Sequence, residues 1–398
     1  MPRRLADWKS TYIKYVEETE PPDLYKEWVA ISVMAAALER KCYIKFGNLV
    51  FYPNMYVILV GPSGICRKNV AMTSGRKLLD NIDVKKAPES TTRVGLIGEL
   101  EDSVASQQLM ADGTTVPSHC SLTVYSPELT VFLGYGQAEL LTDLTNWYDC
   151  DPNWRYKTQG RGLQIMTNVW VNILGATTPD LISSAMPRDT IGGGLASRII
   201  FIYETHKGKT ISLTKMPNED VDLYDNILHD LQEINLMHGS YTYTDSFAKV
   251  FDEWYARSDS NRPTDDPRYF GYISRRATHI VKLCMIHSAS QDDKMIIDDN
   301  TFNRSLDLLL RTEVRMFNTF RGTGYADESE TTAMVMDTIK DRGAITYKEL
   351  LYLFHHDAMK PRMDIILATL VEMGWCMRAF MNNGETIIYK YIYEDRTS

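Results

Sequence analysis

The chain lacks paired cysteines. Its six cysteines are scattered across 398 residues, at Cys42, Cys66, Cys120, Cys150, Cys284 and Cys376. No CxxC pair and no cysteine–histidine cluster has the spacing of zinc ligands, so the sequence predicts no zinc site. We expect reduced and mostly buried thiols.

Long hydrophobic runs are also missing. The longest, residues 57–60 and 29–38, are too short or too interrupted to span a bilayer. The first residues lead into Asp7, Trp8 and Lys9 instead of an apolar signal core, so we expect no export. The sequence therefore predicts a cytoplasmic protein with no membrane partner, in a bacterial cell or an infected host cell.

Basic residues are not in excess. The 43 Lys and Arg against 52 Asp and Glu give a net charge of −9, which argues against a protein coated in positive charge. A local basic patch inside a ring or channel remains open, because such a patch is enough to hold a phosphate backbone. No repeat or low-complexity tract is evident, and 44% apolar with 24% charged residues is typical of globular proteins. The length predicts one larger module and one or two smaller ones.

The central part of the chain has the pattern of an α/β domain. Short apolar strands are expected at 56–60, 121–126, 169–174 and 198–203, separated by helical or loop segments. Continuous apolar strands suit a parallel sheet that is covered on both faces. A hairpin around Gly47-Asn48 precedes them. We place this core domain at residues 41–206.

The flanking regions are mostly helical. Residues 1–40 form a helical N-terminal segment, which Pro21 and Pro22 divide into two helices. Residues 207–325 are expected to form a helical subdomain, because apolar residues recur there at helical spacing.

Residues 326–398 have the order of a winged helix-turn-helix. Helices are expected at 330–341, 346–355 and 361–374, followed by strands at 375–381 and 386–393 around Asn382-Asn383-Gly384. The third helix opens with Lys360 and Arg362, a good position for phosphate contacts. Many winged helices bind protein instead, so both DNA and protein stay open as partners of this module.

A candidate phosphate-binding loop follows the first core strand. Strand 56–60 runs into Gly61-Pro62-Ser63-Gly64-Ile65-Cys66-Arg67-Lys68-Asn69, and a helical pattern begins at residue 70. Glycines let backbone N–H groups close around phosphate oxygens, the helix N-terminus adds positive potential, and a lysine reaches the terminal phosphates.

The spacing of this loop is irregular. The usual pattern would place Arg67 at the lysine position, and Lys68 requires one extra residue. The hydroxyl that normally holds magnesium is replaced by Lys68 or Asn69. A turn that binds no phosphate is the alternative.

Polar residues follow the other core strands. Glu128 comes after strand 121–126 and is a candidate general base, although the aspartate that would orient magnesium is missing. Thr177 or Thr178, after the next strand, could sense a γ-phosphate, or the pair could cap the helix after Pro179. Arg198 follows Gly192-Gly193-Gly194 and is a candidate arginine finger, with a buried salt bridge as the alternative.

Together these stretches resemble a family of AAA+-like P-loop replication ATPases of phages, plasmids and integrated elements, in which the helicase-like domain is sometimes fused to a primase. The resemblance covers roughly residues 20–320. It rests on the order of these pieces: 54–56 before the loop, Ala87-Pro88-Glu89-Ser90-Thr91, 128–134, 144–149, 174–179 and 192–198.

The resemblance implies a P-loop NTPase (AAA+/RecA-like) core that binds ATP and Mg²⁺. It also implies a homo-oligomeric ring, for which we expect a hexamer. Lys68, Glu128, Thr177 or Thr178, and an Arg198 from the next subunit would act together on ATP. Asn69 and Glu128 would be the residues that contact the Mg²⁺ ion. Family members commonly have Ser or Thr where this chain has Asn69.

The resemblance also implies that the protein binds and acts on single-stranded or forked DNA. Between the second and third core strands, basic and aromatic residues alternate from Trp154 to Gly162. This segment looks like a DNA-tracking hairpin in which Arg155, Lys157 and Arg161 hold phosphates while Trp154 or Tyr156 stacks on bases. A solvated hairpin is the alternative.

The leading hypothesis is thus an ATP-dependent DNA helicase or translocase of viral or plasmid replication, with a primase or other replication proteins as possible partners. A hydrolysis-poor initiator or helicase-loading protein is the first alternative, because the magnesium ligands depart from the pattern. A DNA-binding or interaction protein that binds no nucleotide is the second.

Overall fold

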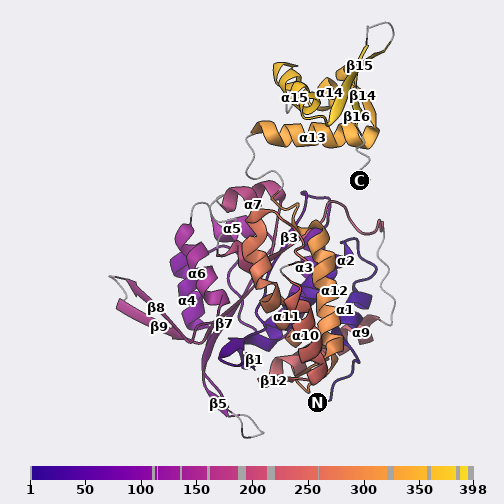
Figure 1. Cartoon of the computed structure of the whole chain (residues 1–398). Coiled ribbons are helices and arrows are strands. Elements are labelled where there is room, and N and C mark those ends of the chain that lie inside the picture. Colours follow the sequence, from indigo (N-terminus) through magenta and orange to yellow (C-terminus); the bar gives the residue numbers. More distant parts are fainter. Residues whose placement is uncertain are drawn as a thin grey trace. The chain divides into compact units, whose positions relative to one another are not determined.

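The computed structural model divides the chain into two compact units, Met1–Thr319 and Phe320–Ser398 (Figure 1). It describes residues 2–109, 113, 115–134, 137–158, 162–186, 194–212, 220–258, 260–320, 327–355, 360–381 and 386–392. No helix in these ranges combines the length and the apolar character that crossing a membrane requires.

A five-stranded mixed sheet forms the centre of the first unit. Its order is β11 (Ile199–Tyr203), β3 (Tyr56–Val60), β10 (Val169–Thr177), β7 (His119–Ser126) and β4 (Val104–Ala105). The first four strands are parallel, and β4 pairs antiparallel with β7 at the edge. The four predicted core strands and the α/β class are therefore confirmed.

Helices cover both faces of this sheet. Asn172 of β10 donates to the Ser32 carbonyl of α2 (Asp23–Leu38), so α2 lies on the face to which Asn172 points. Ile173 points to the other face, and its register partner Tyr56 donates to the Leu144 carbonyl of α6 (Ala138–Tyr148). This two-sided cover explains why every residue of β3, β7 and β10 is buried.

A second sheet joins segments that are far apart in the sequence. Its order is β13 (Ile296–Ile297), β12 (Gly239–Tyr243), β1 (Cys42–Phe46) and β2 (Leu49–Phe51). The predicted hairpin around Gly47 is present as β1 and β2. However, β1 also pairs in parallel with β12, a strand inside the region expected to be a helical subdomain. Residues assigned to the core and to the helical subdomain thus share one sheet.

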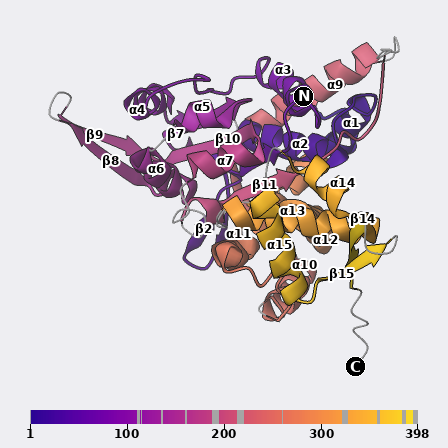
Figure 2. The ribbon, with the colours of Figure 1, turned by 90° about the horizontal axis from the view of Figure 1, so that it is seen from above.

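The remaining helices of this unit pack around the two sheets (Figure 2). They are α1 (Trp8–Tyr15), α3 (Lys68–Leu79), α4 (Arg93–Asp102), α5 (Leu129–Leu133), α7 (Pro179–Ala185), α9 (Asp220–Leu236), α10 (Asp245–Ala256), α11 (Phe270–Gln291) and α12 (Asp299–Met316). Short strands β5 (Gln108–Leu109) and β6 (Thr115–Val116) form a separate pair. The N-terminal segment is tied to α9, because the Asp230 carboxylate accepts from the backbone N–H groups of Arg4 and Leu5.

The second unit contains three helices and a three-stranded antiparallel sheet. The elements are α13 (Asp327–Arg342), β14 (Ala344–Thr346), α14 (Tyr347–Leu353), α15 (Lys360–Glu372), β15 (Cys376–Met381) and β16 (Thr386–Tyr391), with sheet order β14-β16-β15. The predicted helices and strands are present within a few residues, and β14 is additional. The predicted Asn382-Asn383-Gly384 turn lies outside the described residues.

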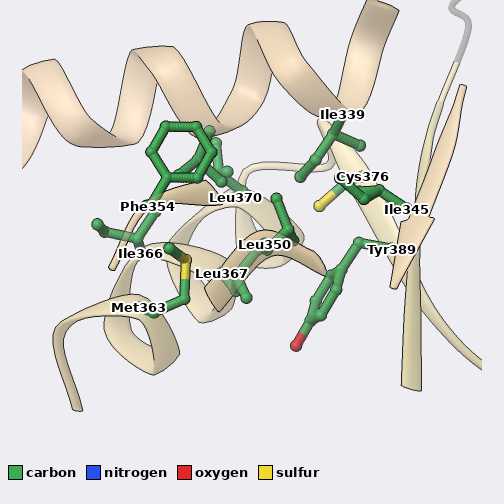
Figure 3. Packing of buried hydrophobic residues seen from close by; sticks show 11 residues of the cluster. Ile339, Ile345, Leu350, Phe354, Met363, Ile366, Leu367, Leu370, Cys376 and Tyr389 are labelled. Carbon is green, nitrogen blue, oxygen red and sulfur yellow. The ribbon is translucent and has the colours of Figure 1, made fainter. Parts of the chain in front are cut away.

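This unit has a hydrophobic core of its own. Figure 3 shows side chains from α13, α14, α15 and the sheet pointing toward one another. The buried cluster consists of Val335, Ile339, Ile345, Leu350, Phe354, Met363, Ile366, Leu367, Leu370, Cys376 and Tyr389. A capping box between Thr346 and Glu349 fixes the start of α14.

Candidate functional site

A pocket of about 690 Å³ lies at the carboxyl edge of the parallel sheet. The segments that follow β3, β7 and β10 meet there because parallel strands end at the same edge. Nine of the residues predicted from the sequence line it: Pro62, Ser63, Gly64, Arg67, Lys68, Asn69, Glu128, Thr177 and Thr178. Its volume lies in the range of small-molecule sites.

The loop after β3 is held close to its neighbours. A Cβ atom on Gly61 would lie 2.5 Å from the Glu204 carbonyl oxygen and 2.7 Å from the Tyr25 hydroxyl. Only glycine therefore fits at this position. The Gly61 N–H donates to the Thr177 carbonyl at 3.3 Å, which links the start of the loop to the end of β10. Gly64 has φ +73°, the left-handed conformation that glycine adopts readily.

Lys68 lies over this loop. It is the first residue of α3, and its Nζ donates to the carbonyls of Gly61 and of Pro62, the latter at 3.2 Å. Burial lowers the pKa of Lys68, while Cys66 and Glu128 act in the opposite direction. The lysine is thus close to both the loop and the candidate general base. This position favours Lys68 over Arg67 as the central cation of the loop.

The loop residues between Gly64 and Lys68 make contacts of other kinds. Arg67 has a left-handed backbone, φ 55° and ψ 36°, and its side chain turns to Glu20. The buried Cys66 thiol donates to the Glu204 carbonyl at 3.1 Å, and burial raises the pKa of this thiol. Ile65 is 48% exposed. Gly61, Ile65 and Cys66 were all predicted to belong to the phosphate loop, but none of the three is among the residues that line the pocket.

The two threonines at the end of β10 differ. Thr178 is the N-cap of α7 and accepts from the Leu181 N–H at 3.4 Å, which is the capping alternative considered for this pair. Thr177 is 2% exposed and lines the pocket. The prediction of a phosphate-sensing hydroxyl therefore rests on Thr177.

The pocket also contains an acidic residue that the sequence reasoning missed. Asp180, in the first turn of α7, lines it together with Glu128 and Asn69. Its position just after Thr178-Pro179 at a strand end was the available signal. Within the described ranges no three His, Cys, Asp or Glu side chains form a metal-binding group. Magnesium commonly takes only one or two carboxylates together with phosphate oxygens, so these oxygen donors fit a phosphate-bound ion.

Arg198 lies at the amino end of the parallel strands, whereas the pocket lies at their carboxyl end. It precedes Ile199, which pairs with Tyr56 at the start of β3, whereas the pocket follows the end of β3. Its guanidinium donates to the Asp149 carboxylate and, at 2.6 Å, to the Gly194 carbonyl. The Arg198 side chain is 8% exposed. The Asp149 side chain is 41% exposed, so the structure shows a partly buried salt bridge, close to the buried one that was the alternative to an arginine finger.

The predicted tracking segment forms an antiparallel hairpin of β8 (Asn153–Thr158) and β9 (Gly162–Thr167), which extends outward from the first unit (Figure 1). Arg155 and Lys157 are exposed, opposite Ile165 and Leu163 in the strand register. The predicted phosphate-binding Arg161 lies outside the described residues.

The aromatic residues of the hairpin lie on its other face. Trp154 packs edge-on against Trp147 of α6 at 5.3 Å, and the Arg93 guanidinium of α4 lies 5.1 Å from the Tyr156 ring centroid. The cations and the aromatic rings thus point in opposite directions. The packing of both rings against the first unit argues against the predicted base stacking by Trp154 or Tyr156.

In the second unit, α15 presents few cations. Lys360 is exposed, but the Nε and Nη2 atoms of Arg362 are buried. Asp364 and Glu372 are exposed on the same helix, and Ile365 is 65% exposed. This composition offers little positive charge to the phosphate backbone that was predicted to contact Lys360 and Arg362.

The sequence matches no family model and no curated protein.

Proposed function

We propose that the first unit binds ATP with Mg²⁺ in the pocket at the sheet edge, and that the chain is an ATP-dependent DNA helicase or translocase of viral or plasmid replication. The observation that carries this proposal is the pocket itself. Three segments that lie far apart in the sequence contribute one predicted group each to the pocket: Lys68, Glu128 and Thr177. The sheet topology brings the three segments together, and the types of side chain that they contribute, a cation, a carboxylate and a hydroxyl, favour a phosphate ligand.

Each of the pocket residues has its own proposed role in ATP binding and hydrolysis. The loop backbone and Lys68 would hold the phosphates, and Thr177 would donate a hydrogen bond to the terminal one. Glu128 is exposed at the pocket and would orient and deprotonate the attacking water. Asn69, Glu128 and Asp180 line the pocket and would hold Mg²⁺ through their side-chain oxygens, and the ion would neutralise phosphate charge when bound.

We assign DNA contact to the exposed face of the β8–β9 hairpin. Arg155 and Lys157 would bind phosphates there, and a homo-oligomer, hexameric in the ring form, would place one hairpin per subunit around a single strand. A primase or another replication protein is a candidate partner of the second unit, where α15 exposes an aliphatic and acidic surface.

The test is ATP binding and turnover, with and without single-stranded DNA. Lys68→Ala is expected to weaken Mg·ATP binding by about tenfold or more, because it removes a charged phosphate ligand. Glu128→Gln is expected to preserve binding and to lower turnover by roughly 10²-fold or more. Lys294→Ala, which removes a 74% exposed lysine far from the pocket in sequence, is the control.

The outcome that would end the proposal is a wild-type protein that binds no Mg·ATP at millimolar concentration. Binding that resists Lys68→Ala would place the nucleotide elsewhere. Turnover that Glu128→Gln leaves unchanged would remove that residue as the general base.

The second candidate function is a hydrolysis-poor replication initiator or helicase-loading protein. Asn69 favours it, because an amide lines the pocket where a magnesium-binding hydroxyl is usual. In that case ATP would change the oligomer mass while turnover stays negligible with or without DNA. A mass measurement with and without Mg·ATP, run beside the turnover assay, separates the two functions.

A further inference from the structure

Arg67 belongs to the pocket, yet an acidic residue from the N-terminal segment holds its side chain. The Arg67 Nε lies 2.7 Å from the Glu20 Oε2, and its Nη1 donates to the Gly64 carbonyl at 3.3 Å. The Arg67 side chain is 43% exposed and lines the same pocket as Lys68. A second cation therefore borders the candidate phosphate site, with its charge directed to a carboxylate.

Glu20 has other partners that keep it in place. Its Oε1 accepts from the Lys207 Nζ at 2.7 Å and from the Ile211 N–H at 3.3 Å. Its backbone carbonyl accepts from the Gly208 N–H at 2.9 Å. The Lys207 hydrogen bond is the largest of several that lower the pKa of Glu20 to about 2, so the group is a carboxylate at neutral pH. Loss of Arg67 would leave these contacts intact.

The ion pair between Arg67 and Glu20 is suited to replacement by a pair between Arg67 and a phosphate group. An exposed ion pair contributes little to stability, because water competes for both charges. A polyphosphate offers a guanidinium more negative charge than one carboxylate. It can also accept two parallel hydrogen bonds from the guanidinium, whereas Glu20 accepts one, from the Arg67 Nε. The left-handed backbone of Arg67 is an uncommon conformation for a residue with a side chain, which marks the loop as held by its surroundings.

We propose that Arg67 is a second phosphate-binding cation, and that Glu20 competes with the nucleotide's phosphates for it and so sets the nucleotide affinity. This inference rests on the proposed nucleotide site. It makes Glu20 a positioning residue that lies outside the loop. It also connects occupation of the pocket to the contact between the N-terminal segment and residues 207–211.

The experiment measures the Kd of Mg·ATP for the full chain by calorimetry. Glu20→Gln is expected to lower the Kd by about two- to fivefold, the range of an exposed ion pair. Glutamine keeps a side-chain oxygen for the Ile211 N–H. Arg67→Ala is expected to raise the Kd by about fivefold or more. In the Arg67→Ala background, Glu20→Gln is expected to have no further effect.

Glu18→Gln is the matched control. Glu18 lies two residues away, is 69% exposed and faces Lys209 at 3.6 Å, so the variant removes the same charge without touching Arg67. Equal Kd values for Glu20→Gln and Glu18→Gln would overturn the inference, as would an equal gain in the Arg67→Ala background. Failure of the wild-type chain to bind Mg·ATP would instead overturn the proposed function. Melting temperatures identify any variant that fails to fold.

Discussion

His279 is a buried histidine in the interior of the first unit. Its Nε2 donates to the Ser197 carbonyl at 3.3 Å, and its Nδ1 accepts from the Tyr148 hydroxyl at 3.1 Å. Burial lowers the pKa of His279 to about 3, since a charged imidazole would lose its hydration there. His279 is therefore neutral in the folded protein over most of the acidic range.

This burial predicts a loss of stability in acid. Between pH 6.5 and about 3 the unfolded chain binds a proton at His279 and the folded chain does not, so the free energy of unfolding falls as the pH falls. His279→Gln should reduce that slope by up to about 1.4 kcal/mol per pH unit. Urea unfolding at several pH values between 7 and 4.5 measures it, with the exposed His206→Gln as the control. An unchanged slope in His279→Gln would contradict the prediction.

At the same scale, the sequence predicts which residues line the candidate site better than it predicts the partner that each side chain contacts. Lys68, Glu128 and Thr177 were predicted because each follows an apolar strand, and the structure brings them to one pocket. The partner of Arg198 is Asp149, which lies 49 positions earlier in the chain. No local pattern specifies such a pair, so a buried salt bridge and a catalytic arginine have the same sequence signature.

At the scale of elements, the strands of the main sheet were predictable because continuous apolar runs require burial on both faces. The pairing of β1 with β12 was not, since each strand is short and nearly two hundred residues separate them. The faces of the β8–β9 hairpin could have been predicted. Its order Trp154-Arg155-Tyr156-Lys157 alternates with period two, which places rings and cations on opposite sides of a strand.

The hairpin makes a prediction about salt dependence. If Arg155 and Lys157 each contact one phosphate, changing both to alanine should make the slope of log K against log salt for single-stranded DNA less steep by about 1.4, or about 0.7 per contact. Titrations at four salt concentrations measure this slope.

Trp154→Ala is the contrasting variant for that measurement. Because Trp154 packs on Trp147, its loss should lower the melting temperature and leave the salt slope unchanged. A slope that is insensitive to Arg155 and Lys157 would remove the hairpin from the DNA-binding surface. A folded Trp154→Ala variant that loses affinity for single-stranded DNA at every salt concentration, with an unchanged slope, would restore the base-stacking interpretation.

At the scale of the whole molecule, each of the two units has its own core. The cluster around Leu350 and Leu367 contains only residues of the second unit. The candidate nucleotide pocket is lined only by residues of the first. We therefore expect two separable unfolding transitions, because cooperativity requires a shared core.

Ligand and mutation should move these transitions independently. Mg·ATP at 100 times its Kd should stabilise the first unit by about 2.7 kcal/mol and leave the second unchanged, since the proposed nucleotide site lies in the first unit. Leu367→Ala, at a side chain that is 1% exposed, should destabilise the second unit by about 2–5 kcal/mol and leave ATP affinity unchanged. Scanning calorimetry of the full chain and of residues 1–319 assigns each transition. A single transition that both changes shift would show that the units fold as one, because the nucleotide would then stabilise a core that it does not contact.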